Sequence, residues 1–273
     1  MLETAPTQFQ DAAGIRFAYR RLGPPDGIPL VGLQHFTGTM DSWDPAVINA
    51  LAQTRPVIVF DNAGVGRSSG VTPDNVEQMA ADAKAFIEAL DLWEVDLLGF
   101  SLGGFLAQVM AVVAPRLIRK LILAGTAPKG GEEHLLAVVE DAFARKGEAD
   151  VRLPLFFTRS ADSQAAGRAF LQRASVRQTD RDPDSSEAVS GAQAKALIDW
   201  CATEDGDTLL KAITQPALVV SGSDDTMLPN SNAMRMYKTI GYAQLILYPD
   251  SGHGALFQDP RRFVAHTLTF LDA

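Results

Sequence analysis

The chain has 273 residues, of which 47% are hydrophobic, and it carries a formal net charge of −9. This length and apolar content fit one large α/β domain or a core domain with an insertion. The acidic charge disfavours nucleic acids and anionic membranes as partners, and the single cysteine, Cys201, excludes an internal disulfide and a metal site of several cysteines. No apolar run reaches the length of a membrane span, and the first residues lack the pattern of a signal peptide, so we expect a cytoplasmic protein.

The first half of the chain predicts a series of strands. Residues 7–23 have the pattern of two short strands joined by a turn near residues 12–14. Four runs that are apolar at most positions, rather than alternating, then predict strands covered on both faces. They begin at Pro29, Arg55, Val95 and Leu117. Between the second and third run, apolar residues recur at helical spacing over residues 72–91, and either Thr72 with Pro73 or Asp74 with Glu77 supplies the start signal.

The strand pattern stops at about Pro128 and resumes near Thr214. The segment between these residues predicts helices and polar loops, including an exposed loop at 179–186. Two further strand runs begin at Pro216 and Ala243, and a helix begins at about Pro260. We therefore predict an α/β fold with a doubly wound, mostly parallel sheet. Residues 1–127 and 214–273 would form its core, and residues 128–213 would form a helical cap.

One serine stands at a position where the backbone is expected to turn sharply. The stretch Gly99-Phe100-Ser101-Leu102-Gly103 follows a predicted strand and precedes a predicted helix, which is the context of a nucleophile elbow. The glycines on either side remove side chains that would collide with the turn. The start of the helix, at Leu102, offers backbone N–H groups to a developing negative charge. The alternative is a plain strand-to-helix turn with a capping serine.

A nucleophilic serine requires a histidine base and a carboxylate that orients it. His253 follows the last predicted strand between two glycines, and Asp224 and Asp225 follow the strand before it. Catalytic groups in parallel sheets gather beyond the carboxyl ends of the strands, so we expect these loops to meet near Ser101. This pattern alone does not decide which of the two aspartates is the orienting carboxylate.

These motifs resemble those of the α/β-hydrolase superfamily, in its branch of serine hydrolases with a helical cap and carboxylesterase-like activity. The stretch DNAGVGRSSG is similar to the family's D-x-R-G-x-G-x-S loop, and LVVSGSDDTMLP is similar to its acid loop. The resemblance implies Asp225 as the triad acid, with Asp224 as the minor alternative. HFTGTMDSW is similar to the family's oxyanion loop, which implies that His35 braces the loop and that Thr37, or alternatively Phe36, donates an N–H beside that of Leu102.

The resemblance implies a serine hydrolase that cleaves a small to medium hydrophobic ester or lactone through an acyl-enzyme. Ser101, His253 and Asp225 would be catalytic, and neither a cofactor nor a metal would be required. Carbon–carbon bond hydrolysis, perhydrolase or cofactor-free haloperoxidase activity, and a non-catalytic receptor for small molecules are the alternatives. The sequence does not indicate an oligomeric state. Aromatic residues that would line a hydrophobic substrate pocket are Phe36, Trp43, Phe156, Phe157, Phe170 and Trp200.

Overall fold

Strands from both halves of the chain join in one mixed sheet. The structure, a computed structural model, describes residues 1–134, 137–138, 150–203 and 206–273. Within these residues the sheet has eight strands in the order β1-β2-β4-β3-β5-β6-β7-β8. Their bounds are β1 Gln8–Ala12, β2 Ile15–Leu22, β3 Leu30–Leu33, β4 Val57–Phe60, β5 Val95–Phe100, β6 Ile118–Ala124, β7 Ala217–Gly222 and β8 Ala243–Tyr248. β1 and β2 are antiparallel to their neighbours, and the other strands run parallel.

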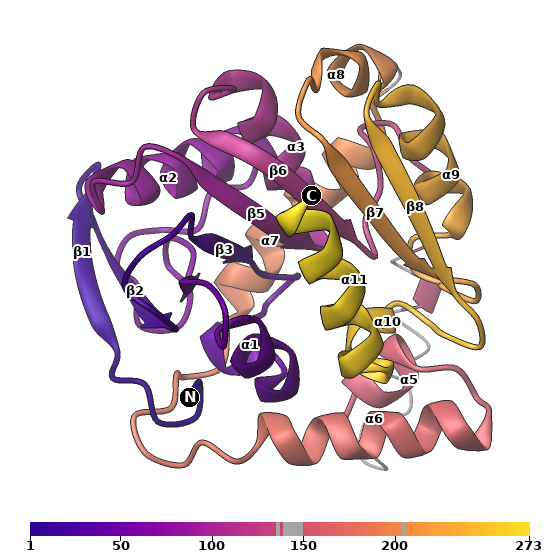
Figure 1. Cartoon of the computed structure of the whole chain (residues 1–273), viewed down its shortest axis with the longest axis horizontal. Coiled ribbons are helices and arrows are strands. Elements are labelled where there is room, and N and C mark those ends of the chain that lie inside the picture. Colours follow the sequence, from indigo (N-terminus) through magenta and orange to yellow (C-terminus); the bar gives the residue numbers. More distant parts are fainter. Residues whose placement is uncertain (135–136, 139–149, 204–205) are drawn as a thin grey trace.

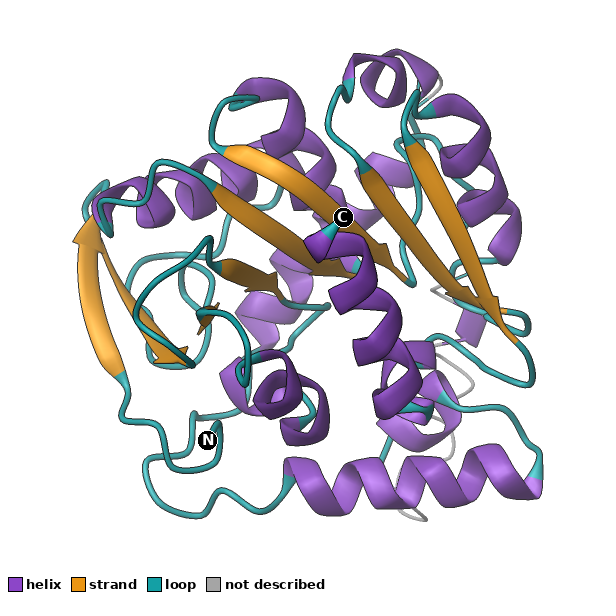
Figure 2. Cartoon of the chain, viewed as in Figure 1, coloured by secondary structure: helices purple, strands orange, loops and turns teal. Residues whose placement is uncertain are grey.

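This topology confirms the predicted fold class, and each predicted strand is present (Figure 2). Strands β3, β4, β5 and β7 are buried along their whole length, as their continuous apolar runs predicted. Successive side chains of a strand point to opposite faces of the sheet, so neighbouring residues enter different clusters. Leu97 lies in the cluster on one face, and Leu98 lies in the cluster on the other.

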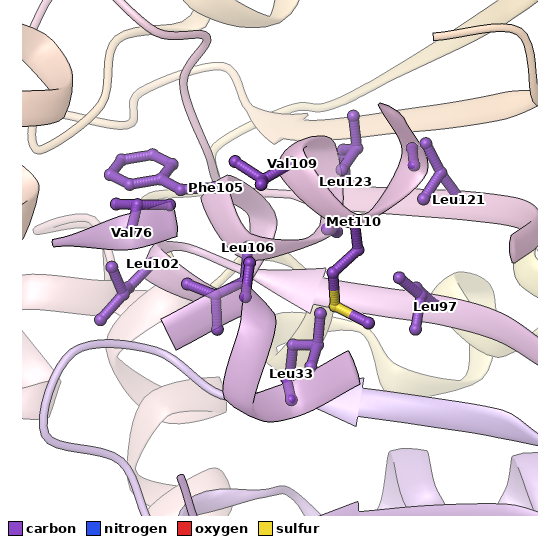
Figure 3. Close-up of a cluster of buried hydrophobic side chains, with 14 of the residues drawn as sticks. Leu33, Val76, Leu97, Leu102, Phe105, Leu106, Val109, Met110, Leu121 and Leu123 are labelled. Carbon is purple, nitrogen blue, oxygen red and sulfur yellow. The ribbon is translucent and has the colours of Figure 1, made fainter. Parts of the chain in front are cut away.

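Helices cover both faces of the sheet. α2 (Val76–Ala89), α3 (Leu102–Val113) and α9 (Asn230–Thr239) contribute to one apolar cluster, and Figure 3 shows side chains of α3 packed on Leu33, Leu97 and Leu123. α1 (Pro45–Leu51) and α11 (Pro260–Asp272) belong to the other cluster and lie in front of the sheet in Figure 1. The short helices η1 (Met40–Ser42) and α10 (Ala255–Gln258) lie beside the loops that follow β3 and β8. The core therefore consists of two apolar layers separated by the sheet.

The start of α2 differs from the predicted signals. Its N-cap is Asn75, whose side chain accepts a hydrogen bond from the backbone N–H of Gln78, whereas Thr72 and Asp74 lie before the cap. Thr72 is instead buried and donates its hydroxyl to the carbonyl of Ala63. This hydroxyl therefore braces the loop after β4 and does not cap α2.

Between β6 and β7 the described residues form helices and no strand. They are α5 (Arg152–Phe156), α6 (Ala161–Ala174), α7 (Glu187–Cys201) and α8 (Asp207–Ala212). α6 packs against α10 and α1, α7 against α2, and α8 against α3 and α9. The predicted helix after Glu132 falls largely on residues 135–136 and 139–149, outside the described residues. The division into a core and a cap at 128–213 stays a prediction, and in the described part of the chain no helix is long and apolar enough to span a bilayer.

Candidate active site

Ser101 occupies a strained turn between β5 and α3. Its backbone angles are φ 54° and ψ −119°, a conformation that costs a non-glycine residue about 1–3 kcal/mol and persists only where the surroundings impose it. Its backbone N–H donates to the carbonyl of Ala124 at 3.0 Å, and its own carbonyl accepts the hydroxyl of Thr126 at 2.8 Å. Although Ser101 is the N-cap of α3, its side chain makes no capping hydrogen bond. The hydroxyl is therefore held at the turn without being used to stabilise the helix.

The glycines on either side of this serine are required by close backbone contacts. A Cβ at Gly99 would lie 2.5 Å from the carbonyl oxygen of Gly103, and a Cβ at Gly103 would lie 2.0 Å from the carbonyl oxygen of Leu33. Real Cβ atoms do not approach backbone atoms this closely, so any larger residue would push α3 away from the sheet. The glycine spacing in the sequence thus reflects the packing of the turn that carries Ser101.

His253 and Asp225 come from neighbouring strand ends and form a buried pair. The Nδ1 atom of His253 lies 2.8 Å from Oδ2 of Asp225, and both side chains are almost completely buried. The carboxylate has no hydrogen to give, so Nδ1–H is the donor and Nε2 carries the lone pair that a general base needs. The other oxygen, Oδ1, accepts the backbone N–H groups of Met227 and Leu228 at 2.9 and 3.0 Å. Asp224, the alternative acid, is exposed and accepts a hydrogen bond from its neighbour Ser223.

Ser101 and His253 line one cavity of about 90 Å³. Its walls come from the loop after β3, the nucleophile turn, the acid and histidine loops, and α5. The lining residues are His35, Phe36, Thr37, Ser101, Val151, Arg152, Leu155, Phe156, Met227 and His253. The three loops that the sequence predicted to meet therefore do meet, at the carboxyl edge of the parallel strands.

The predicted aromatic pocket is only partly present in this cavity. Phe36 and Phe156 line it, whereas four of the proposed aromatic residues are absent from the lining: Trp43, Phe157, Phe170 and Trp200. Trp43 is fully buried against Phe257, and Trp200 stacks on Phe105 with ring centroids 5.1 Å apart. Phe157 and Phe170 pack against one another in the second apolar cluster. These four side chains contribute to the hydrophobic core because each finds an aromatic partner away from the cavity.

The two backbone N–H groups proposed for the oxyanion hole differ in whether they already have a hydrogen-bond partner. Leu102 is the first residue of α3, where the backbone N–H has no partner within the helix. The N–H of Thr37 already donates to Oε1 of Gln193, on α7, at 2.6 Å. Thr37 has a positive φ of 58° and lines the cavity, as does the alternative donor residue, Phe36. One of the two proposed donors, the N–H of Thr37, is therefore already hydrogen-bonded to a side chain of the protein itself.

His35 is neutral and held by its own loop. Its Nδ1 donates to the carbonyl of Phe36 at 2.8 Å, and burial lowers its pKa from 6.5 to about 3, with smaller contributions from Arg152 and His253. The ring makes edge-on contacts with Phe100 and Phe156. These contacts hold the ring in place, and the bracing role that the resemblance implies stays a prediction.

Several residues around the site carried no signal in the sequence. Val151, Arg152 and Leu155 reach the cavity from α5 and its start, and Gln193 reaches Thr37 from α7. α5 is fixed over the histidine loop because the carbonyl of Phe156 accepts the backbone N–H of Gly254 at 2.9 Å. Their positions depend on how the helices between β6 and β7 pack, which no local motif encodes.

Metal and thiol chemistry find no support among the described residues. No group of three histidine, cysteine, aspartate or glutamate side chains within them could hold a metal ion. Burial raises the pKa of the Cys201 thiol to about 12, so this side chain stays protonated at neutral pH.

The sheet topology together with the serine elbow and the histidine and acid loops defines an α/β hydrolase. A sequence model described as the alpha/beta hydrolase fold matches residues 29–260, which is most of the chain. The chain therefore belongs to the α/β-hydrolase fold family and is an enzyme of the hydrolase class.

Comparisons with individual proteins agree with this assignment. A solved alpha/beta hydrolase fold protein from Chitinophaga pinensis is 45% identical, with a TM-score of 0.93 over 100% of this chain and 99% of that chain. A putative carbamate hydrolase RutD from Rhizobium rhizogenes is 28% identical over 95% of this chain and 98% of its own length. A non-heme chloroperoxidase from Burkholderia pyrrocinia is 29% identical over 95% of this chain and 97% of its own length.

Proposed function

We propose that this protein is a serine hydrolase that cleaves a small to medium hydrophobic carboxylic ester or lactone through an acyl-enzyme. The observation that carries the proposal is the buried hydrogen bond between His253 and Asp225 beside a cavity that also exposes the strained Ser101. An oriented imidazole and a serine held at a sharp turn are the two parts that acyl transfer requires.

In the first half of the reaction, Ser101 Oγ attacks the acyl carbon and forms a new C–O bond. Its proton passes to Nε2 of His253, and Asp225 stabilises the imidazolium through the hydrogen bond at Nδ1. The carbonyl oxygen becomes an oxyanion, which the backbone N–H groups of Leu102 and Thr37 would stabilise. The bond to the leaving alcohol then breaks, and the alcohol departs with the proton from His253.

In the second half, water attacks the acyl-enzyme and gives a proton to His253. Collapse of the second tetrahedral intermediate breaks the bond to Ser101 Oγ, which recovers its proton from the imidazolium. The carboxylic acid is released and the enzyme returns to its starting state. The same two N–H groups would stabilise both oxyanions, because each intermediate places its negative charge at the same position.

The substrate class is proposed from the lining of the cavity. Phe36, Leu155, Phe156 and Met227 supply an apolar wall on which an alkyl or aryl group would pack. The volume of about 90 Å³ accommodates only a small acyl group without rearrangement. The named relatives are a carbamate hydrolase and a chloroperoxidase, so family membership alone does not select the substrate, and the cavity is the better guide.

The experiment is labelling with a fluorophosphonate probe, with Ser101→Ala as the matched control. We expect the wild-type protein to be modified once, at Ser101, and the variant to remain unlabelled. A panel of chromogenic esters, lactones and diketones then measures turnover, and we expect the esters or lactones to be preferred. Wild-type protein that resists the probe would support a non-catalytic receptor, and diketone cleavage without ester turnover would support a carbon–carbon bond hydrolase. Ester turnover that survives Ser101→Ala would reject the assigned nucleophile.

A further inference from the structure

Both backbone polar groups of Thr37 are bound by side chains from the segment between β6 and β7. Its N–H donates to Gln193 Oε1 at 2.6 Å, and its carbonyl accepts the hydroxyl of Ser185 at 2.9 Å. Thr37 is β-branched and has a φ of 58°, a conformation that such residues rarely adopt without external support. The two hydrogen bonds supply that support and fix the direction in which the N–H of Thr37 points.

The oxygen of Gln193 takes the place of a substrate oxygen. A backbone N–H carries a single hydrogen, so Thr37 cannot serve an oxyanion in full while it donates to Oε1 at so short a distance. The amide carbonyl and an ester carbonyl are similar neutral acceptors, and exchanging one for the other changes little. An oxyanion accepts a markedly stronger hydrogen bond, so it would displace the amide as charge develops.

The amide nitrogen of Gln193, Nε2, is buried beside the oxygen that binds Thr37. Gln193 is 1% exposed, and its Nε2 finds no hydrogen-bond partner among the residues that the structure describes. A buried donor without an acceptor is unfavourable, and such atoms need an explanation in a folded protein. Because Nε2 and Oε1 share one carbon, this donor lies close to the oxyanion position. A ligand oxygen that takes the place of Oε1 would therefore lie near Nε2.

The backbone that carries Gln193 is fixed, so the amide must leave by rotation of its side chain. On α7, Trp200 stacks against Phe105 of α3 and donates its Nε1–H to the carbonyl of Ala127. These contacts tie α7 to α3 and to the loop after β6, and a hinge motion would break them. Rotation about side-chain bonds needs no such break.

We propose that Gln193 determines specificity by exchanging one hydrogen bond for another as the bound substrate reacts. This inference rests on the proposed function. Oε1 accepts the N–H of Thr37 before the reaction, and the oxyanion that forms from the substrate carbonyl displaces it. Nε2 then donates to an oxygen bonded to the carbon next to the acyl carbonyl, because that atom lies beside the carbonyl oxygen. The favoured substrates are acyl groups with an ether, hydroxyl or keto oxygen at this position.

A pair of isosteric esters tests the donor. p-Nitrophenyl methoxyacetate and p-nitrophenyl butanoate differ only by an ether oxygen in place of a methylene group. In Gln193→Leu, we expect kcat/KM for the methoxyacetate, divided by kcat/KM for the butanoate, to fall by about 5- to 10-fold, the loss of one hydrogen bond. The ratio cancels any general damage to the site. Gln172→Leu, at an exposed glutamine of α6, is the matched control and should leave the ratio unchanged.

A second variant tests the cap on Thr37. In Gln193→Glu, a carboxylate oxygen accepts the N–H of Thr37 more strongly than the amide does, and its charge repels an oxyanion. We expect kcat to fall by about 100-fold or more for both esters, comparable to the removal of an oxyanion-hole donor. Labelling of Ser101 by the fluorophosphonate probe should slow in parallel.

The outcomes separate this inference from the proposed function. Wild-type protein that hydrolyses the esters, combined with an unchanged ratio in Gln193→Leu, rejects the role of Nε2. Wild-type rates in Gln193→Glu reject the role of Oε1. Wild-type protein that hydrolyses neither ester and resists the probe rejects the proposed function, and the role of Gln193 is rejected with it. If Gln193→Glu does not fold, the ratio measured in Gln193→Leu still decides.

Discussion

The two carboxylate oxygens of Asp225 have different partners: one faces the imidazole of His253, and the other accepts two backbone N–H groups of the loop that carries Asp225. The Oδ2 atom lies 2.8 Å from His253 Nδ1, and Oδ1 accepts from Met227 and Leu228 at 2.9 and 3.0 Å. The hydrogen bonds at Oδ1 therefore fix the carboxylate in its loop, and Oδ2 is left to orient the imidazole. Changing the oxygen that faces His253 should alter catalysis while the loop keeps its hydrogen bonds.

Asp225→Asn tests this division of roles. Its Oδ1 can still accept the two backbone N–H groups, but its amide nitrogen would then face His253 and stabilise the wrong tautomer. We expect kcat to fall by about 10⁴ with little change in KM, as in other triads that lose their carboxylate. Steady-state kinetics with a chromogenic ester provide the measurement.

The neighbouring aspartate offers a matched control for this substitution. Asp224 is exposed and its carboxylate accepts a hydrogen bond from Ser223, away from His253, so Asp224→Asn should keep the wild-type rate. Equal losses in the two variants would contradict the assignment of Asp225 as the orienting acid.

The fold and the positions of Ser101 and His253 follow from local signals in the sequence, whereas the choice of Asp225 over Asp224 comes from the family resemblance. Ser101 lies between glycines at a strand-to-helix boundary, and Asp225 and His253 each follow a strand by a few residues. Parallel strands present their carboxyl ends at one edge, so the order of strands and loops is sufficient to bring these side chains to one place.

The walls of the site depend on packing between distant helices, which these signals do not contain. Gln193 and Arg152 belong to helices whose apolar faces do not specify which core loop they cover. Trp43 shows the opposite error: its position near the oxyanion loop predicts a cavity-lining residue, but it is buried in the core. The absence of a side chain at Gly32 instead lets the indole ring pack directly on β3.

The buried, neutral ring of His35 should make the folded protein less stable in mild acid. Its pKa is about 3 in the folded protein and 6.5 when unperturbed, because burial favours the neutral ring. The folded state thus binds fewer protons below pH 6.5, so the stabilisation is complete above that pH and is lost as the pH falls from 6.5 towards 3. At pH 5 the loss is about 2 kcal/mol.

His35→Gln should remove this contribution. We expect the difference in free energy of unfolding between wild type and variant to change by about 2 kcal/mol between pH 7.5 and pH 5, measured by urea denaturation. His134→Gln, at an exposed histidine, is the matched control. A difference that stays constant with pH for both variants would show that His35 is not held neutral by the fold.

Substitution by alanine should have opposite effects on stability at Gly103 and at Gly191. In Gly103→Ala the new Cβ would meet the carbonyl oxygen of Leu33 at 2.0 Å, so α3 must shift and carry Ser101 with it. We expect a loss of about 1–3 kcal/mol in stability and of about 100-fold in kcat/KM, since a displacement of about 1 Å is sufficient for such a loss.

The control lies on an exposed part of α7. A Cβ at Gly191 would have no neighbour within 4 Å, and alanine is the better helix former. Gly191→Ala should therefore raise the free energy of unfolding by about 0.5–1 kcal/mol and leave the rate unchanged. Thermal or urea denaturation with ester kinetics checks both variants. A harmless Gly103→Ala would mean that the turn tolerates a wider separation between β3 and α3.

Arg20 predicts that one buried cation holds the loop after α6 to the sheet. Its fully buried guanidinium bonds to Asp41 Oδ1 at 2.6 Å and to Asp182 Oδ2 at 3.3 Å. Asp182 lies in the loop at 179–186 that the sequence predicted to be exposed, but its side chain is buried, and burial raises its pKa. Without Arg20, the carboxylate of Asp41 would remain in the interior with reduced compensation, and the carboxyl group of Asp182 would lose a hydrogen bond.

Arg20→Met should therefore lower the free energy of unfolding by about 3–5 kcal/mol, the cost of breaking a buried ion pair from one side. Arg67 provides the comparison, because it contacts Asp182 at 3.6 Å and Asp180 at 2.8 Å with a side chain that is 36% exposed. Arg67→Met should cost about 1 kcal/mol or less, since solvent screens an exposed pair. Urea denaturation at neutral pH measures both. Similar losses in the two variants would mean that the loop is held by its apolar contacts, and that burial of the cation adds nothing to its attachment.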